Sequence, residues 1–220
     1  TVIYGGPADD PDITLYATTN DGYLQAVNAK TGKELWSFIP KEMLKRLEPL
    51  MLNDETDSRD YGLDGSMEVA RLDRNNDGTI DYDDGDRVYL YFGMRRGGYH
   101  YYAVDVTTRT SPKLMWRIGR ADSGIAVDSS KELPGVGQTW SSPTVARVNI
   151  DRSWGSNADK MVLIFGGGYD TGQDSIGYSV DGVGNRIFMV DALTGDLIWY
   201  AGDDADADRV HIGSAGIRPR

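Results

Sequence analysis

Residues 26–36 read AVNAKTGKELW, and residues 189–199 read MVDALTGDLIW. The two segments align without a gap, with Asn or Asp at the third position, Thr-Gly at the sixth and seventh, and tryptophan at the end. A further copy, residues 103–116, also ends in tryptophan and carries three additional residues in its turn. Self-similarity of this kind is the signature of a repeat architecture.

Each copy predicts two short strands joined by a tight turn, because apolar residues alternate on both sides of the turn residues. Further strands are predicted upstream, at residues 65–73, 87–93, 141–149 and 160–167. A unit of four antiparallel strands is the blade of a β-propeller. The tryptophans lie 80 and 83 residues apart, whereas a common blade has about 40 to 50 residues, so each unit is expected to carry insertions.

We therefore expect an all-β fold in which residues 1–220 are part of a single β-propeller domain with about three four-stranded blades. The expected blade units are about 1–40, 64–120 and 139–202, with insertions at 41–63 and 121–138 and the start of a further blade at 209–220. Apolar residues at helical spacing after Pro40 predict one short helix within residues 40–52, which Pro49 kinks or ends. Three blades cannot close a ring of about four to eight, so we expect a piece of a longer propeller or completion by other segments.

Residues 73–84 read DRNNDGTIDYDD and predict a calcium loop. The candidate ligands alternate along the chain, with Thr79 contributing its backbone carbonyl: Asp73, Asn75, Asp77, Thr79 and Asp81. Ca²⁺ takes about six to eight oxygen ligands, and Gly78 stands where such a loop turns sharply. Asp84 replaces the usual terminal Glu, and whether it ligates stays open. A solvated acidic turn is the alternative, which explains the composition but not the alternation.

The segments that flank this loop favour strands rather than helices. Residues 67–72 read MEVARL and residues 87–93 read RVYLYFG, with no helix-forming segment on either side. We therefore expect an EF-hand-like loop inserted into a β-hairpin of one blade, where the ion ties down an insertion.

Composition and charge exclude several classes of protein. The chain has 220 residues, 40% of them hydrophobic, and no apolar run of about 18 residues, so no membrane-spanning helix is expected. The net charge of −11, from 34 acidic and 23 basic residues, disfavours nucleic acid and favours cations. There are no cysteines, so disulfides and thiolate metal sites are excluded. No signal peptide is visible, which indicates that a leader was removed or that the sequence is internal.

The repeat motif resembles the tryptophan-docking motif of quinoprotein-like β-propellers. More narrowly, the segments at 16–40, 63–73, 141–149, 162–170 and 185–199, in that order, resemble the C-terminal propeller of the PilC/PilY family. The members of this family are large proteins associated with the tip of bacterial type IV pili.

The resemblance implies a secreted, calcium-binding type IV pilus biogenesis factor and tip-associated adhesin. Such a protein acts in pilus assembly, in extension and retraction and therefore twitching motility, and in surface attachment. Implied partners are minor pilins or other pilus-tip proteins, and host or surface receptors. The implied location is the cell surface or pilus tip, outer membrane-associated or periplasmic, in a Gram-negative bacterium. The family's five-ligand calcium pattern carries over onto the five residues named above, although the family's own loop lies in a different blade.

Two alternatives remain open. The first is a quinone (PQQ)-dependent dehydrogenase. Two features argue against it: the chain lacks the cysteine pair that lines the quinone pocket in many such enzymes, and its predicted calcium ligands lie in one contiguous loop rather than in separate blades. His100 and His211 accompany no nucleophile motif, and the glycines at 166–168 lack the Gly-Lys-Ser/Thr of a phosphate loop, so we expect no enzyme. The second alternative is a calcium-stabilised surface adhesin unrelated to pili.

Aromatic residues allow two interpretations. Trp36, Trp116 and Trp199 are expected to pack between blades rather than to contact a cofactor. The tyrosines could form a binding face, or they could simply reflect the preference of tyrosine for strands; they cluster at Tyr89, Tyr91, Tyr99, Tyr101 and Tyr102.

Overall fold

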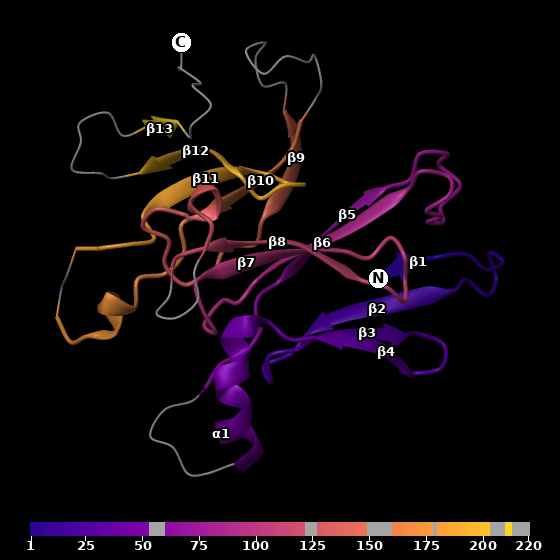
Figure 1. Ribbon diagram of the computed structural model, residues 1–220, viewed down its shortest axis with the longest axis horizontal. Coiled ribbons are helices and arrows are strands. Elements are labelled where there is room, and N and C mark those ends of the chain that lie inside the picture. The colour runs from indigo at the N-terminus through magenta and orange to yellow at the C-terminus, as the bar shows by residue number, and fades with distance from the viewer. Residues whose placement is uncertain (53–59, 122–126, 149–159, 178–179, 203–209, 213–220) are drawn as a thin grey trace.

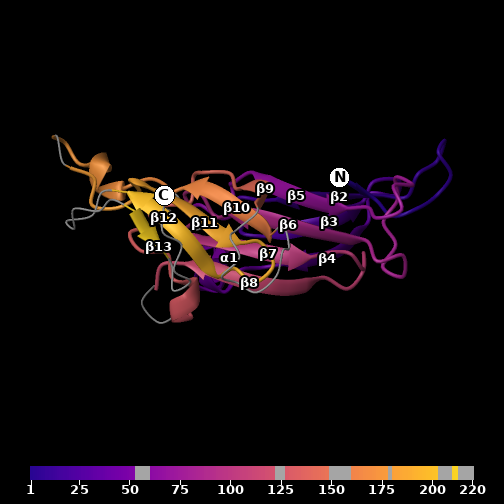
Figure 2. The ribbon, with the colours of Figure 1, turned by 90° about the horizontal axis from the view of Figure 1, so that it is seen from above.

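The computed structural model describes residues 1–52, 60–121, 127–148, 160–177, 180–202 and 210–212. These residues form three antiparallel sheets and short helices, so the prediction of an all-β fold with four-stranded units is confirmed. The sheets follow one another in chain order, from the indigo strands at the lower right of Figure 1 to the yellow strands at the top. Viewed from above, their strands lie over one another in successive layers (Figure 2). No helix in the described part of the chain is long and apolar enough to span a membrane.

Within each sheet the strands are neighbours in sequence order. The first sheet contains β1 (Val2–Ile3), β2 (Ile13–Thr18), β3 (Leu24–Asn28) and β4 (Glu34–Phe38). The second contains β5 (Met67–Leu72), β6 (Arg87–Gly93), β7 (His100–Asp105) and β8 (Lys113–Gly119). The third contains β9 (Thr144–Val148), β10 (Lys160–Gly166), β11 (Arg186–Asp191), β12 (Leu197–Gly202) and β13 (Val210–Ile212).

Strand β13 differs from its expected place. Residues 209–220 were expected to start a further blade, whereas β13 pairs antiparallel with β12 and becomes the fifth strand of the third sheet. Residues 209 and 213–220 lie outside the described residues, as do 53–59 and 122–126 of the expected insertions. The further blade therefore stays a prediction.

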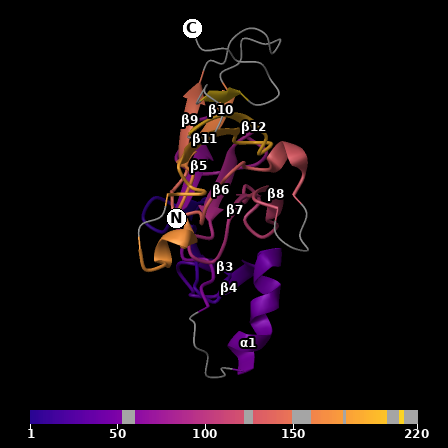
Figure 3. The same ribbon diagram turned by 90° about the vertical axis from the view of Figure 1, so that its left-hand side faces the viewer.

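The predicted short helix is present. A 3-10 turn, η1 (Lys41–Arg46), continues into α1 (Leu47–Leu52), and Figure 3 shows this helical segment extending beyond the sheets, at the end opposite β9 and β12. Pro49 lies in the first turn of α1 and does not end it, since a proline there forgoes no intrahelical hydrogen bond. Two further 3-10 turns are η2 (Ser129–Lys131), which lies in the expected insertion at 121–138, and η4 (Thr171–Asp174), which lies between β10 and β11.

The repeated turn has one hydrogen-bond pattern in the first and third sheets. The Asn28 Oδ1 accepts from the backbone N–H groups of Lys30 and Thr31, at 3.0 and 2.9 Å. Asp191 Oδ1 likewise accepts from the N–H groups two and three residues on, at 2.9 and 3.1 Å. Gly32 and Gly195 then adopt φ of 69° and 76°, a conformation that glycine reaches without a steric penalty. The repeat motif therefore specifies a turn in which the Asn or Asp side chain accepts two backbone hydrogen bonds and the glycine has a positive φ.

Two of the three repeat tryptophans, Trp36 and Trp116, join neighbouring sheets, as expected. Trp36 Nε1 donates to the carbonyl of Arg109 in the second sheet at 2.9 Å. Trp116 Nε1 donates to the carbonyl of Ala192 in the third sheet, also at 2.9 Å. The first bond ends on the turn between β7 and β8, and the second ends on the turn between β11 and β12. One apolar core fills each of the two spaces between sheets.

The tyrosines belong mainly to these cores. Tyr91, Tyr101 and Tyr102 are at most 1% exposed, and Tyr89 is 8% exposed. Tyr101 packs against Phe165 of the third sheet, with ring centroids 4.4 Å apart. The interpretation of Tyr91, Tyr101 and Tyr102 as a binding face was therefore wrong, because they face the neighbouring sheets rather than solvent.

A buried polar cluster fixes the helical insertion to the second sheet. Glu42 of η1 accepts hydrogen bonds from the Tyr102 hydroxyl and the Arg117 guanidinium, and its carboxylate lies 3.8 Å from Nδ1 of His100. Burial acts to raise the pKa of Glu42, but the Tyr102 hydrogen bond and the His100 and Arg117 charges outweigh it and hold that pKa below its ordinary value. His100 itself is fully buried.

Candidate metal centre

The loop between β5 and β6 contains all five predicted calcium ligands. Three of their side chains accept from the backbone N–H two residues further on: Asn75 from Asp77 at 3.2 Å, Asp77 from Thr79 at 2.7 Å, and Asp81 from Asp83 at 2.8 Å. Such turns repeat at alternate positions and wind the backbone tightly. The residues whose side chains accept these hydrogen bonds are themselves three of the predicted ligands.

Asp73 stands at the start of this loop. Its Oδ2 accepts from the N–H of Gly78 at 2.9 Å and lies 3.2 Å from the Arg71 guanidinium. Its Oδ1 is buried and has no hydrogen-bond partner within the described residues. Gly78 has φ of 89°, which permits the sharp turn that brings its N–H back to Asp73. A buried carboxylate oxygen without a donor is the kind of atom that a cation satisfies.

Two residues fix the base of the loop. Ile80 is 4% exposed and packs in the core between the first and second sheets. Asp86 is fully buried, and its two oxygens accept from the N–H groups of Arg74 and Asp81, at 2.8 and 3.1 Å. The sequence alone does not single out Asp86, since one more aspartate in an acidic stretch carries no distinguishing signal.

The donor chemistry of the loop fits a calcium ion. Carboxylate, amide and backbone oxygens are the ligands that Ca²⁺ prefers, and the orphan Asp73 Oδ1 adds a site-specific reason. Hydrogen bonds from Thr79, with a smaller one from Asn75, lower the pKa of Asp77, so its carboxylate is ionised at neutral pH. In the described part of the chain, however, no three His, Asp or Glu side chains converge as a ready metal-ligand group. Calcium binding therefore stays a prediction.

Asp84, whose role was left open, contacts the loop from its far end. Its Oδ2 accepts from the side-chain amide of Asn75 at 3.0 Å, and the same amide donates to Asp77 at 3.0 Å. Asp84 therefore lies beside two predicted ligands, although it is one atom shorter than the glutamate that usually ends such loops.

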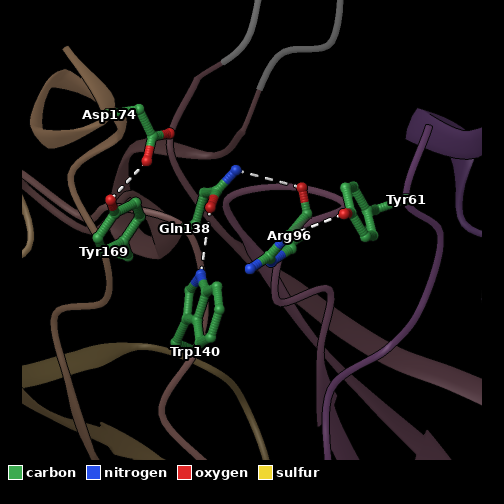
Figure 4. Close-up of a pocket in the computed structure, with 6 residues that line it drawn as sticks. All are labelled: Tyr61, Arg96, Gln138, Trp140, Tyr169 and Asp174. Atoms are coloured by element: carbon green, nitrogen blue, oxygen red, sulfur yellow. Dashed lines mark hydrogen bonds between the residues drawn. The ribbon is translucent and has the colours of Figure 1, made fainter. Parts of the chain in front are cut away.

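A pocket of about 400 Å³, hereafter the loop pocket, lies at a different place, where connections of the second and third sheets meet. Figure 4 shows its lining, which consists of Tyr61, Arg96, Gln138, Trp140, Tyr169 and Asp174. Gln138 joins the two sides, since its amide donates to the carbonyl of Arg96 at 3.2 Å and accepts from the Trp140 indole at 3.1 Å.

Aromatic rings and guanidinium groups stack around this pocket. The Arg96 guanidinium lies 5.0 Å from the Tyr61 ring centre and 5.2 Å from that of Trp140, and Arg95 lies 4.3 Å from the Trp140 ring. Tyr169 donates to Asp174 at 2.6 Å. These contacts hold the side chains in place before any ligand arrives.

Comparison with known proteins identifies relatives. The chain is 31% identical over 158 residues to a type IV pilus biogenesis factor PilY1 homolog of Xylella fastidiosa, covering 68% of this chain. It is 30% identical over 165 residues, 71% of this chain, to the type IV pilus biogenesis factor PilY1 of Pseudomonas aeruginosa. The chain belongs to the PilY1 family. The search of family models found no match.

The PilY1 relatives are far longer than this chain, which spans only 11% and 13% of their lengths. The fold agrees with the crystal structure of the Pseudomonas aeruginosa PilY1 C-terminal domain, with a TM-score of 0.54 at 22% sequence identity. That likeness covers 89% of this chain and 31% of the other. The resemblance to the PilC/PilY family stated from the sequence is therefore confirmed, and a role in pilus biogenesis is supported by the relatives' names.

Several other expectations can now be compared with the structure. The PilY1 relatives are named as biogenesis factors rather than enzymes. Gly166 ends β10 and Gly168 has φ of 101°, so these glycines lie at a strand end, as expected. No sequence pattern indicates the six loop-pocket residues, because they come from four separate connections.

Proposed function

We propose that this chain is the part of a type IV pilus biogenesis factor in which a calcium loop stabilises one blade of a β-propeller. The observation that carries the proposal is the loop between β5 and β6, where Asp73 keeps a buried, unpartnered oxygen beside alternating oxygen ligands. The relatives' names support the pilus role. The protein would work through protein contacts, not catalysis, at the pilus tip or cell surface.

The proposed ligands are Asp73, Asn75, Asp77, Asp81 and the backbone carbonyl of Thr79. When bound, calcium supplies charge neutralisation for three carboxylates that otherwise repel one another. Ile80 connects the loop to the core, and Asp86 connects it to the start of β6, so an ordered loop stabilises the hairpin of β5 and β6. In the intact protein, such a loop would make the strength of the blade depend on extracellular calcium, which is how it would influence pilus extension and retraction.

Propeller closure is part of the same proposal. Trp36 and Trp116 each bond to the following sheet in the same way, which supports a regular succession of blades. Trp199 occupies the equivalent register position, opposite Met189, and would present its indole N–H to a further blade. Segments of the longer protein would supply the blades that complete the ring.

The loop pocket is the proposed contact site for a pilus-tip protein, such as a minor pilin, or for a surface receptor. Trp, Tyr and Arg dominate the energetics of protein interfaces, and Tyr61, Arg96, Trp140 and Tyr169 bring these types together in a concave site. Their mutual contacts reduce the entropy lost on binding.

A deletion strain complemented with the full-length protein tests this function. Wild-type protein restores surface piliation and twitching, and the Trp140→Ala variant is expected to lose pilus co-purification without a change in melting temperature. Leu114→Ala removes an exposed apolar side chain elsewhere, 53% exposed, and serves as the control. Normal piliation in the deletion strain would exclude the pilus role and leave a surface adhesin unrelated to pili.

A further inference from the structure

Three arginines line a pocket of about 480 Å³ formed by residues of the second and third sheets. Arg74 comes from the candidate calcium loop, Arg87 begins β6, and Arg147 lies near the end of β9. Tyr89 and the apolar side chains of Leu72 and Met161 also line this pocket. We call this site the arginine pocket.

The three guanidinium groups lack acidic partners. Within the described residues, Arg74, Arg87 and Arg147 form no ion pair with Asp or Glu, whereas Arg71, Arg95, Arg109 and Arg117 each do. Arg87 donates to the carbonyls of Asp86 at 2.6 Å and Tyr82 at 3.4 Å, which leaves its charge uncompensated. In a chain with a net charge of −11, three such arginines around one cavity are not explained by general composition.

Local packing keeps two of the arginines close to the pocket. The Arg74 side chain runs over Gly85, where a Cβ atom would lie 3.3 Å from its Cδ. The Arg87 guanidinium lies 4.4 Å from the ring centre of Tyr82. Arg74 and Arg87 are also near enough to Tyr89 to act on its hydroxyl. Burial, aided by Asp105, nevertheless raises the pKa of Tyr89, so the phenol stays protonated and can donate a hydrogen bond.

We propose that the arginine pocket binds an anionic group with two or more negative charges, carried on a partly apolar ligand. Guanidinium groups bind carboxylate, sulfate and phosphate through paired hydrogen bonds, and three of them around a concave site concentrate a positive field. Tyr89 adds a neutral donor, and Leu72 and Met161 supply apolar surface for the carrier. The volume suits a sugar-sized or side-chain-sized group rather than a flat surface contact.

Two sources carry this chemistry, namely carboxylates, as in acidic side chains or sugar acids, and tetrahedral oxyanions, as in sulfated or phosphorylated ligands. Titrations with succinate and with sulfate separate them, and sucrose serves as an uncharged probe. Amide NMR spectra of the isotope-labelled chain report binding at the backbone of residues 72–74, 85–89 and 147. All titrations are run on the calcium-free chain, with the chelator removed beforehand because EDTA is itself a polycarboxylate. Ionic strength is held constant, so the result does not depend on the calcium site.

Saturable shifts at these residues with at least one anion, and none with sucrose, are expected. The anion that binds with the higher affinity shows whether the site prefers a carboxylate or a tetrahedral oxyanion. Arg147→Gln is expected to weaken binding about tenfold, since it removes one charge-assisted contact from an exposed side chain that has no structural partner among the described residues. Lys33→Gln makes the same charge change in the first sheet and is expected to leave affinity unchanged. Shifts that do not saturate with either anion, or an equal loss in both variants, would overturn the proposal.

Discussion

Trp116 Nε1 donates a 2.9 Å hydrogen bond to the carbonyl oxygen of Ala192, which lies in the adjacent sheet, 76 residues further along the chain. The Trp36 indole makes the equivalent bond to Arg109. Trp36 and Trp116 therefore each hold the following repeat, and the turn that receives Trp116 is the turn that the motif specifies. The tryptophan that ends the sequence repeat is therefore also the residue that joins neighbouring sheets.

Removing the Trp116 ring is expected to destabilise the chain strongly. Trp116 is 3% exposed and stacks on Tyr91, with ring centroids 5.8 Å apart. Trp116→Ala should cost about 3 to 5 kcal/mol, as large-to-small substitutions in cores do. Trp116→Phe keeps most of the apolar contact and loses the hydrogen bond, so it should cost less. Urea unfolding followed by circular dichroism measures both, and equal stability of Trp116→Ala and wild type would contradict the role assigned to this ring.

Gly195 and Gly32 form a matched pair. Both have positive φ, so alanine at either position costs about 1 to 2 kcal/mol of backbone strain. At Gly195, the added Cβ would lie 2.8 Å from Cγ of Trp116, whereas nothing lies within 4 Å at Gly32. Gly195→Ala is therefore expected to lower the free energy of unfolding by about 1 to 3 kcal/mol more than Gly32→Ala. Equal effects in thermal melts would argue against close docking of the tryptophan.

Asp86 is expected to matter for stability even without calcium. Asp86→Ala leaves the N–H groups of Arg74 and Asp81 without their acceptors at a part-buried site, and each lost hydrogen bond to a charged group costs about 1.5 to 3 kcal/mol. Asp84→Ala removes an exposed carboxylate from the same loop and should cost little in EDTA. A difference of less than about 1 kcal/mol between the two variants in urea unfolding would exclude Asp86 as the anchor of the loop.

The Glu42 cluster predicts a dependence of stability on pH. The folded-state pKa of Glu42 lies below its ordinary value of 4.5, so its ionised form stabilises the fold. This contribution is complete above pH 4.5 and is lost as the pH falls through the folded pKa. The stability difference between wild type and Glu42→Gln should therefore be largest near neutral pH and should shrink in acid. Glu48→Gln, at the start of α1, is the control, and a difference that grows in acid would reverse the assignment.

The sequence predicted the fold well where the signal is local. The Asn/Asp and Thr-Gly residues of the repeat dictate a turn through their own hydrogen bonds, and the flanking strands follow. The tyrosines were ambiguous because alternation places side chains on a face of a sheet without showing what covers that face. Tyr101 is buried by Phe165, a contact between residues 64 apart that no local pattern encodes.

Some residues of the candidate sites can be predicted from local sequence spacing, whereas others are brought together only by the fold. The predicted calcium ligands follow a fixed spacing within one loop, so Asp73 to Asp81 could be proposed from the sequence. The loop pocket and the arginine pocket each depend on connections from different sheets, so Trp140 and Arg147 carried no signal beforehand. Asp86 was missed because its importance comes from burial, which charge alone does not reveal.

Calorimetric titration with calcium tests the central claim most directly. The chain is expected to bind one Ca²⁺ with a dissociation constant of about 10⁻⁴ to 10⁻³ M, typical of extracellular modules, and to bind Mg²⁺ much more weakly. Asp77→Ala is expected to abolish binding and the accompanying rise in melting temperature. Asp83→Ala makes the same charge change at a position outside the predicted ligand set and should retain both. Absence of binding heat at millimolar calcium, or equal loss in the two variants, would contradict the calcium loop.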